Sequence, residues 1–292
     1  MSVRPDERAA RLALERLGGM SAETQRAQLK PMAGGTHERS WLVTYDDGRR
    51  HVLRTATPGS SALLDIVTEA RAMIAAANAG LAPAVVAIDA ERGTLLTEYR
   101  AGKPWRSTDA RKPRNLERLA GVLRVLHAVP VELPAFAAER VANGYLARLG
   151  VSAVQHDARA ARWGEELVAL AHRYDARYAP TAFCHHDLVA ANIVDDGELA
   201  LVDFEYAVRG TPLLDLASFA AMNGLAGDER HALLAAYVAR APDVAELEEL
   251  VTLVRLVRLM AWFWALLGAT QTVAPSAYAP YLAVLAVDLE RE

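Results

Sequence analysis

The sequence contains one cysteine and three lysines, and both shortages exclude classes of protein. Cys184 alone cannot form an intramolecular disulfide or a cysteine-rich zinc site. A reducing compartment fits this composition, so we expect a cytoplasmic protein. The formal net charge is −4 and the lysines are scattered, so no polybasic segment predicts a nucleic-acid partner. The lysines are Lys30, Lys103 and Lys112.

Long apolar runs are also missing. The longest, residues 259–270, is too short to span a bilayer, and charged residues interrupt the apolar residues near the start. We therefore expect neither a membrane anchor nor a secretory signal. With 292 residues, of which 52% are hydrophobic and 23% charged, the chain has the ordinary composition of a globular protein with one large domain or two lobes.

The first hundred residues alternate between strand and helix patterns, and the rest is mostly helical. This shift predicts an α+β fold with two lobes: a small antiparallel-sheet lobe over residues 1–100 and a larger helical lobe over residues 101–292. We expect strands over residues 28–32, 41–45, 51–55, 85–88 and 94–98, and helices over residues 5–18 and from Ser61 to Asn78. Further helices are expected over about residues 116–127, 135–149, 158–178, 212–222, 228–239, 244–268 and 277–289.

A hairpin pattern at residues 183–206 carries three polar residues at its ends. Two apolar strands, residues 193–194 and 199–202, flank an Asp-Asp-Gly turn, and Asp187, Asn192 and Asp203 lie just outside them. Phosphoryl transfer from ATP needs one carboxylate to orient the attacking hydroxyl and oxygen ligands to hold Mg²⁺. We therefore assign Asp187 as the catalytic carboxylate and Asn192 and Asp203 as metal ligands.

Two features of the first hundred residues fit ATP as the phosphoryl donor. Gly34, Gly35 and Thr36 lie between two predicted strands, where backbone N–H groups can approach phosphate oxygens. Arg54 ends a strand and Glu69 lies on the next helix, so an ion pair between them can hold the guanidinium on the phosphates. Each feature also has an ordinary explanation, a simple turn or a surface ion pair. We favour the functional explanation because both features occur in a chain that also carries the Asp187, Asn192 and Asp203 set.

The central stretch resembles the choline/ethanolamine kinase family of the aminoglycoside-phosphotransferase-like superfamily, which has the protein-kinase-like fold. The resemblance rests on the His-x-Asp-x-x-x-x-Asn pattern of residues 185–192 and on Asp-Phe-Glu-Tyr at residues 203–206. Val-Leu-Arg at residues 52–54, Pro-Leu-Leu-Asp-Leu-Ala at residues 212–217 and an aromatic segment at residues 263–271 also look like that family.

The resemblance implies further roles in the nucleotide site and beneath the loop. Glu98 and Tyr99 would present backbone groups to adenine at the hinge. Asp215 would support the catalytic loop without touching the substrate, and His185 would pack beneath that loop.

For the acceptor, the resemblance implies a pocket of aromatic faces and an acid that surrounds a quaternary ammonium. Two departures weaken this pocket, because Leu267 and Met222 stand where choline kinases often carry a second Trp and an acidic residue. Trp262 also has an ordinary explanation, since aromatic residues on an apolar helix usually pack in the core. The candidate substrate-binding residues are Glu205, Tyr206, Trp262 and Trp264.

Three functions remain open. The first is phosphorylation of choline or ethanolamine, with ATP and Mg²⁺ as cofactors and a small-molecule alcohol as partner. The second is phosphorylation of another small molecule, with thiamine first and an aminoglycoside less favoured, because no acid-rich pocket is evident. The third is a non-catalytic nucleotide-binding protein, which the presence of Asp187, Asn192 and Asp203 disfavours. The sequence does not predict the oligomeric state.

Overall fold

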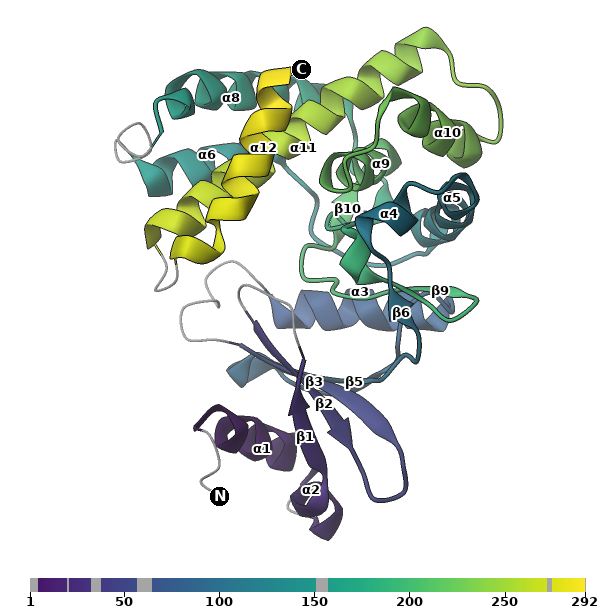
Figure 1. The fold of residues 1–292 in the computed structure, drawn as a ribbon, viewed down its shortest axis with the longest axis vertical. Coiled ribbons are helices and arrows are strands. Elements are labelled where there is room, and N and C mark those ends of the chain that lie inside the picture. The colour runs from purple at the N-terminus through teal and green to yellow at the C-terminus, as the bar shows by residue number, and fades with distance from the viewer. Residues whose placement is uncertain are drawn as a thin grey trace. The chain divides into compact units, whose positions relative to one another are not determined.

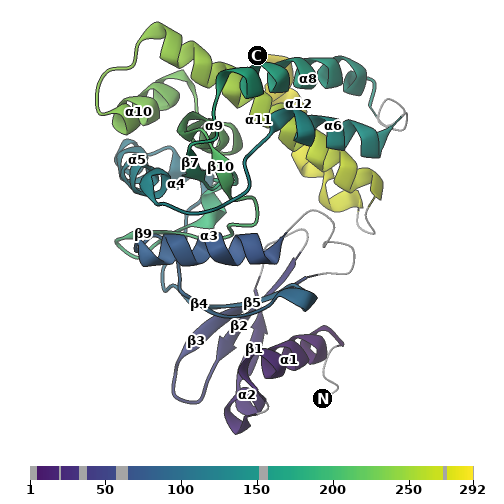
Figure 2. The same ribbon diagram turned by 180° about the vertical axis from the view of Figure 1, so that it is seen from behind.

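The protein is described from a computed structural model, which divides into two compact units. Figures 1 and 2 show the ribbon from opposite sides. The structure describes residues 5–19, 21–32, 38–56, 65–150, 157–271 and 275–291. The first unit, which we call the sheet unit, consists of Met1–Trp105, Val129–Leu133 and Ala191–Ala207. The second, the helical unit, consists of Arg106–Ala128, Pro134–Ala190 and Val208–Glu292.

The sheet unit contains a five-stranded antiparallel sheet with the strand order β1-β2-β3-β5-β4. Its five strands match the five that the sequence predicts, so this part of the α+β assignment is confirmed. Their bounds are β1 (Gln28–Pro31), β2 (Glu38–Thr44), β3 (Arg50–Ala56), β4 (Val85–Asp89) and β5 (Thr94–Glu98).

Two helices cover opposite faces of this sheet, as Figures 1 and 2 show. Helix α1 (Pro5–Gly18) packs through Leu14 into a core that includes Leu53 of β3. Because successive strand residues point to opposite faces, Arg54 lies on the face of helix α3 (Ile66–Asn78). Helix α3 is capped by Asp65, whose side chain accepts the Val67 N–H. Ser61, the expected start of this helix, lies outside the described residues. A short helix α2 (Ala22–Arg26) and a 3₁₀ turn η1 (Ala90–Arg92) complete this region.

The predicted hairpin is present in the sheet unit as β8 (Ile193–Asp195) and β9 (Leu199–Leu201), with β6 (Lys103–Pro104) paired to β8. Ile193 lies opposite Leu201, and Gly197 in the turn has φ +111°, a backbone conformation that favours glycine. The register places the ends of β8 and β9 together. Asn192 and Asp203 therefore leave the hairpin at the same end, and Val202 N–H donates to the Asn192 carbonyl at 3.0 Å.

The helical unit is built around α11 (Val244–Gln271), which contacts α6 (Ala138–Leu149), α8 (Arg159–Arg177), α9 (Pro212–Met222) and α12 (Ala279–Arg291). The helices predicted beyond residue 115 are all present, with bounds within three residues of those expected. The short strand β7 (Ala182–Cys184) pairs with β10 (Val208–Gly210), which the sequence did not predict. The remaining elements are α4 (Ser107–Ala110), α5 (Pro113–Ala128), α10 (Gly227–Val238), η2 (Ala190–Asn192) and η3 (Pro275–Ala277).

The apolar character of helix α11 extends beyond residues 259–270, the longest apolar run expected from the sequence. Among the described residues, one helix, over residues 244–270, is long and apolar enough to cross a membrane. Its side chains are instead mostly buried inside the protein. Arg258 is 4% exposed and lies 3.6 Å from Asp288 of α12, and Arg255 pairs with Glu166 of α8. These contacts are those of a core helix, so the helix is weak evidence for a membrane span.

Candidate active site

The carboxylate of Asp215, on α9, holds the backbone of the loop that carries Asp187. Its Oδ2 accepts the His185 N–H and its Oδ1 accepts the His186 N–H, each at 2.8 Å. Asp215 is fully buried, and His127 Nε2, from α5, lies 3.1 Å from Oδ2. Both carboxylate oxygens are therefore satisfied by groups from the loop and from a neighbouring helix.

The surroundings of Asp215 keep this carboxyl ionised. Burial by itself would raise its pKa, but the hydrogen bond and charge of His127 and the His185 N–H lower the pKa to about 2. His127 Nδ1 in turn lies 2.8 Å from the hydroxyl of Tyr237 on α10. The chain Tyr237–His127–Asp215 therefore links two helices to the loop backbone.

The loop itself has an unusual backbone just before Asp187. His186 has φ +63°, a left-handed conformation that is costly for a residue with a side chain. Asp187 N–H donates to Nδ1 of the fully buried His185 at 3.3 Å, which requires a lone pair on that nitrogen. The His186 ring packs edge-on against Phe136, with 4.5 Å between the centroids. Burial lowers the pKa of His186 to about 4, and the nearby histidines also lower it, although the charge of Asp215 acts in the opposite direction. The His186 ring is therefore neutral at pH 7.

In the sheet unit, Arg54 gathers three carboxylates. It forms the expected ion pair with Glu69, and its Nη2 lies 3.1 Å from Asp203 Oδ1 and 3.8 Å from Glu205 Oε2. Glu69 is 3% exposed, so this guanidinium is held from one side by a buried carboxylate. Three carboxylates around one guanidinium leave an excess of negative charge, which favours an additional cation.

Asp203 and Asn192 supply oxygen atoms suited to Mg²⁺. Asp203 has φ +69°, and its buried Oδ1 accepts no hydrogen bond from the described residues, although Arg54 lies at ion-pair distance. The Arg54 guanidinium balances the charge at this oxygen, while the Asp203 side chain is 34% exposed overall, so the carboxylate can still bind a hard cation. The amide of Asn192 is buried on the adjoining segment. These residues therefore fit a Mg²⁺ ion.

The predicted catalytic set is divided between the units. Asp187 belongs to the helical unit, whereas Asn192 and Asp203 belong to the sheet unit. Glu98 and Tyr99, at the end of β5, use their N–H groups in bonds to Ala84 and Arg50 carbonyls. Adenine recognition by these two residues would thus involve their carbonyl groups. Gly34, Gly35 and Thr36 lie outside the described residues.

The four candidate substrate residues have different surroundings. Glu205 and Tyr206 are partly buried in the sheet unit, with Glu205 directed at Arg54. Trp264 is partly buried in the helical unit, where its ring meets Tyr278 and Tyr281 edge-on at 5.4 and 6.0 Å. Trp262 is 0% exposed.

The structure gives Trp262 a role in the core instead of the substrate role considered from the sequence. Its ring stands edge-on to Trp163 at 4.8 Å and to Phe263 at 5.0 Å, which leaves no face for a ligand. Sequence periodicity could not separate the two tryptophans, because they are two positions apart on a helix that is apolar on several sides.

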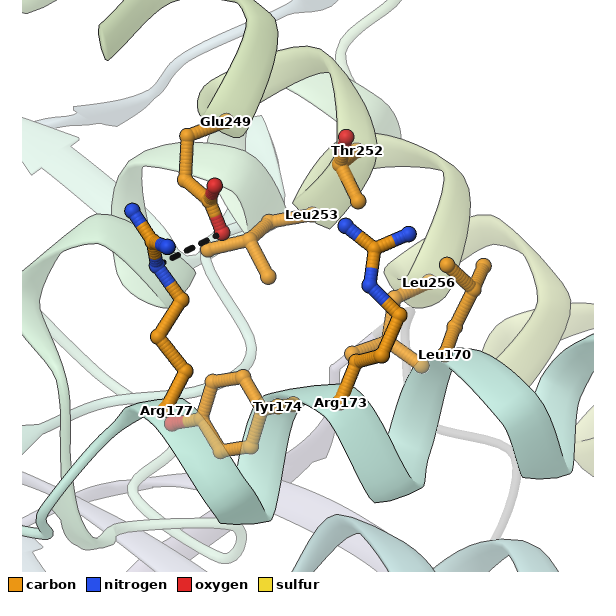
Figure 3. Close-up of a pocket in the computed structure, with 8 residues that line it drawn as sticks. All are labelled: Leu170, Arg173, Tyr174, Arg177, Glu249, Thr252, Leu253 and Leu256. Carbon is orange, nitrogen blue, oxygen red and sulfur yellow. Dashed lines mark ion pairs between the residues drawn. The ribbon is translucent and has the colours of Figure 1, made fainter. Parts of the chain in front are cut away.

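Two cavities in the helical unit lie apart from these residues. One, between α8 and α11, has about 20 Å³ and is bordered by the Arg177–Glu249 ion pair, as Figure 3 shows. It has room for about one water molecule. A second, of about 400 Å³, shares Arg177 and Glu249 and extends to Tyr237. No residue predicted to be in the active site lines either cavity.

Three polar residues that contact the loop or its anchor were not predicted from the sequence: His127, Tyr237 and Asn223. The first two form the link to Asp215 described above. Asn223 follows α9, and its side chain bonds the backbone of Leu188 and Ala190. An Asn followed by Gly224 at the end of a predicted helix was the one signal available, and it marks a helix end only.

We predict that Asp215→Asn destabilises the protein in a pH-dependent way. The folded pKa of Asp215, about 2, lies below its ordinary value of 3.8, so its charge stabilises the fold above pH 3.8 and less as pH falls toward 2. The substitution also sets an amide NH₂ against a backbone N–H. Unfolding with denaturant at pH 6 is expected to show a loss of about 3–5 kcal/mol.

The difference from wild type should shrink by about 2 kcal/mol between pH 5 and pH 2. Asp46→Asn, which removes an exposed carboxylate paired with Arg26, serves as the matched control and should change stability by less than about 1 kcal/mol. A pH-independent difference for Asp215→Asn would contradict the assigned charge.

Comparisons with known proteins agree with this geometry. A choline/ethanolamine kinase family protein from Mesorhizobium loti has a TM-score of 0.78 at 22% identity, covering 97% of this chain and 93% of that one. A choline kinase from Streptococcus pneumoniae, also solved with AMP, has a TM-score of 0.76 at 18% identity, covering 91% and 94%. A Plasmodium vivax ethanolamine kinase has 0.72 at 15% identity, covering 92% and 84%.

At these identities the likeness establishes the fold, and the α+β, protein-kinase-like fold predicted from the sequence is confirmed. No curated protein matches the sequence. The model of the phosphotransferase enzyme family matches residues 28–250, which is most of the chain and includes the loop, the hairpin and α9. The chain therefore belongs to the phosphotransferase enzyme family.

Proposed function

We propose that this phosphotransferase is an ATP- and Mg²⁺-dependent kinase that transfers the γ-phosphoryl group to the hydroxyl of choline or ethanolamine. The observation that carries the proposal is the group around Arg54. A guanidinium held by buried Glu69 lies 3.1 Å from Asp203 Oδ1 and 3.8 Å from Glu205 Oε2, so two further carboxylates stand beside one cation. This arrangement supports binding of both phosphate oxygens and a divalent cation.

Each residue has a distinct proposed role. Asp187 orients the acceptor hydroxyl and takes its proton as the new oxygen–phosphorus bond forms and the bond to the β-phosphate oxygen breaks, which releases ADP. Arg54 neutralises phosphate charge, and Asn192 and Asp203 hold Mg²⁺. The ion, when bound, neutralises negative charge on the transferring phosphates. Glu98 and Tyr99 contact adenine, and the backbone of Gly34, Gly35 and Thr36 covers the phosphates.

The choice of acceptor rests on the aromatic residues of the helical unit. The Trp264 ring, which is partly exposed, lies 5.4 Å from the ring of Tyr278 and 6.0 Å from that of Tyr281. Tyr278 is buried, so Trp264 and the exposed Tyr281 are the rings that can present surface to an acceptor. Aromatic faces of this kind attract a quaternary ammonium or a protonated amine by about 0.5–2 kcal/mol. Glu205 and Tyr206, in the sheet unit, remain predicted acceptor-binding residues. The choline and ethanolamine kinases among the structural relatives support the same acceptor class. A cytoplasmic location also stays a prediction.

The proposal is tested by ADP release with ATP and Mg²⁺ in the presence of choline, ethanolamine, thiamine or an aminoglycoside. We expect the fastest turnover with choline or ethanolamine, and none after EDTA removes the metal. Asp187→Asn should lower kcat by about 10²- to 10⁴-fold, because it removes the proton acceptor.

Asp46→Asn is again the control, since this carboxylate is exposed and should leave kcat unchanged. Turnover with thiamine alone would overturn the acceptor assignment and leave the kinase assignment standing. Absence of ADP release with every acceptor would contradict the proposed function.

We further predict that Trp264→Ala raises the KM for the acceptor by roughly 3- to 30-fold, in line with a lost cation–π contact. The KM for ATP should stay within about twofold, because the proposed nucleotide-binding residues belong to the sheet unit. Trp262→Ala is the matched comparison: it should lower the free energy of unfolding by about 3–5 kcal/mol without a selective change in acceptor KM. An equal rise of both KM values in Trp264→Ala would make this residue a core residue.

A further inference from the structure

Asn223 contacts the catalytic loop on the far side of Asp187 from Asp215. It caps the C-terminal end of α9 and is 5% exposed. Its Oδ1 accepts the Ala190 N–H at 2.8 Å, and its Nδ2 donates to the Leu188 carbonyl at 2.9 Å and to the Phe219 carbonyl at 2.8 Å. The side-chain amide thus uses both of its N–H groups and its oxygen on buried backbone groups.

A helix cap alone does not explain these contacts. The backbone N–H of Asn223 already caps α9 through the carbonyls of Phe219 and Ala221. Two of the side-chain bonds go instead to the loop. The loop presents one acceptor, the Leu188 carbonyl, and one donor, the Ala190 N–H. A side-chain amide has both a donor and an acceptor and can bond the two groups at once. A carboxylate cannot donate to Leu188, and an apolar side chain leaves two buried backbone groups unpaired, each at a cost of about 1–3 kcal/mol.

Asp215 and Asn223 therefore bracket the catalytic carboxylate from one helix. Asp215 fixes the N–H groups of His185 and His186, which precede Asp187, and Asn223 fixes Leu188 and Ala190, which follow it. Asp215 lies in the first turn of α9 and Asn223 is the C-cap eight residues later, a span of about 12 Å along a rigid helix. Fixing the backbone on both sides of one residue restricts the direction of its side chain.

We propose that Asn223 is a positioning residue for phosphoryl transfer, which holds the outgoing arm of the loop so that Asp187 points at the acceptor hydroxyl. This inference rests on the proposed function, because it assigns Asn223 a role through Asp187. The residue itself touches neither substrate. Its effect should appear in the chemical step, since misplacement of a reacting group by about 1 Å can cost about 10²-fold in rate.

The test compares Asn223→Leu and Asn223→Gln with wild type in the ADP-release assay at saturating ATP and acceptor. Leu removes all three hydrogen bonds, and Gln keeps the amide but displaces it by one methylene group. We expect kcat to fall about 10- to 100-fold for Leu and less for Gln, with both KM values within about threefold of wild type. Unfolding curves establish that the variants assayed are folded, and Gln provides the folded variant if Leu is too unstable.

Asn115→Leu is the matched control. Asn115 also donates from Nδ2 to a backbone carbonyl, that of Asp109, but it lies at the start of α5, and its bond leads to no described residue of the loop. It should lower stability without a selective loss of kcat. A purely structural role for Asn223 predicts the same outcome for both residues, and that result would overturn the inference.

A double-mutant cycle shows whether Asn223 acts through Asp187. In the Asp187→Asn background, Asn223→Leu should lower the residual kcat by less than about twofold, because the positioned carboxylate is already absent. Independent, multiplicative losses would contradict positioning through Asp187. If the wild-type protein turns over and the Asn223 variants match it, the inference fails and the proposed function stands. If the wild type releases no ADP with any acceptor, both fail.

Discussion

The arrangement of the catalytic loop depends on one buried charge, the carboxylate of Asp215. A buried carboxylate is costly unless donors surround it, and here two backbone N–H groups and His127 supply them. The same bonds hold His186 in a left-handed conformation that it would otherwise avoid. Burial of the charge and strain in the loop are therefore mutually dependent: the carboxylate stabilises the strained backbone, and the backbone satisfies the carboxylate.

In the sheet unit, the buried charge of a carboxylate is balanced by a guanidinium and not by backbone N–H groups. Arg54 stands among Glu69, Asp203 and Glu205, so one guanidinium faces three carboxylates. Only Glu69 is deeply buried on helix α3, and it fixes the guanidinium from one side. Asp203 places its buried Oδ1 3.1 Å from the guanidinium, while its side chain is 34% exposed overall and can accept a further ligand. Such a group is prepared for a further cation and for phosphate oxygens, which is the chemistry proposed for this chain.

Much of the fold follows from local sequence patterns, so the strands and helices that depend on them were correctly predicted. The alternation Val52-Leu53-Arg54 places Leu53 in the core under α1 and Arg54 on the opposite face, because strand periodicity is fixed. The hairpin register likewise brings Asn192 and Asp203 to one end. The resemblance to known kinases supplied the expected place of Asp215 beneath the loop. The catalytic roles of these residues remain predictions.

Contacts between distant segments were not predictable in the same way. His127 and Asp215 are 88 residues apart, and no periodicity relates them. Asn223 resembles an ordinary helix cap in sequence, and only the packing of α9 against the loop shows its other two bonds. Trp262 and Trp264 have the same local pattern but different exposure, because the helices around α11 cover one and leave the other accessible. Side-chain function at these positions is decided by tertiary packing, which composition and spacing do not encode.

Side chains of α9 and of its C-cap hold the loop backbone in place before any substrate binds. Residue-resolved amide hydrogen exchange of the ligand-free protein tests it most directly. The amides of His185 and His186 lie outside helices and strands, and Ala190 is the first residue of the short turn η2. All three nevertheless donate to the side chains of Asp215 or Asn223. The account predicts that they exchange as slowly as amides of the neighbouring strand β7. Exchange at the rate of an unprotected loop would contradict it, because the loop would then be ordered by substrates and not by α9.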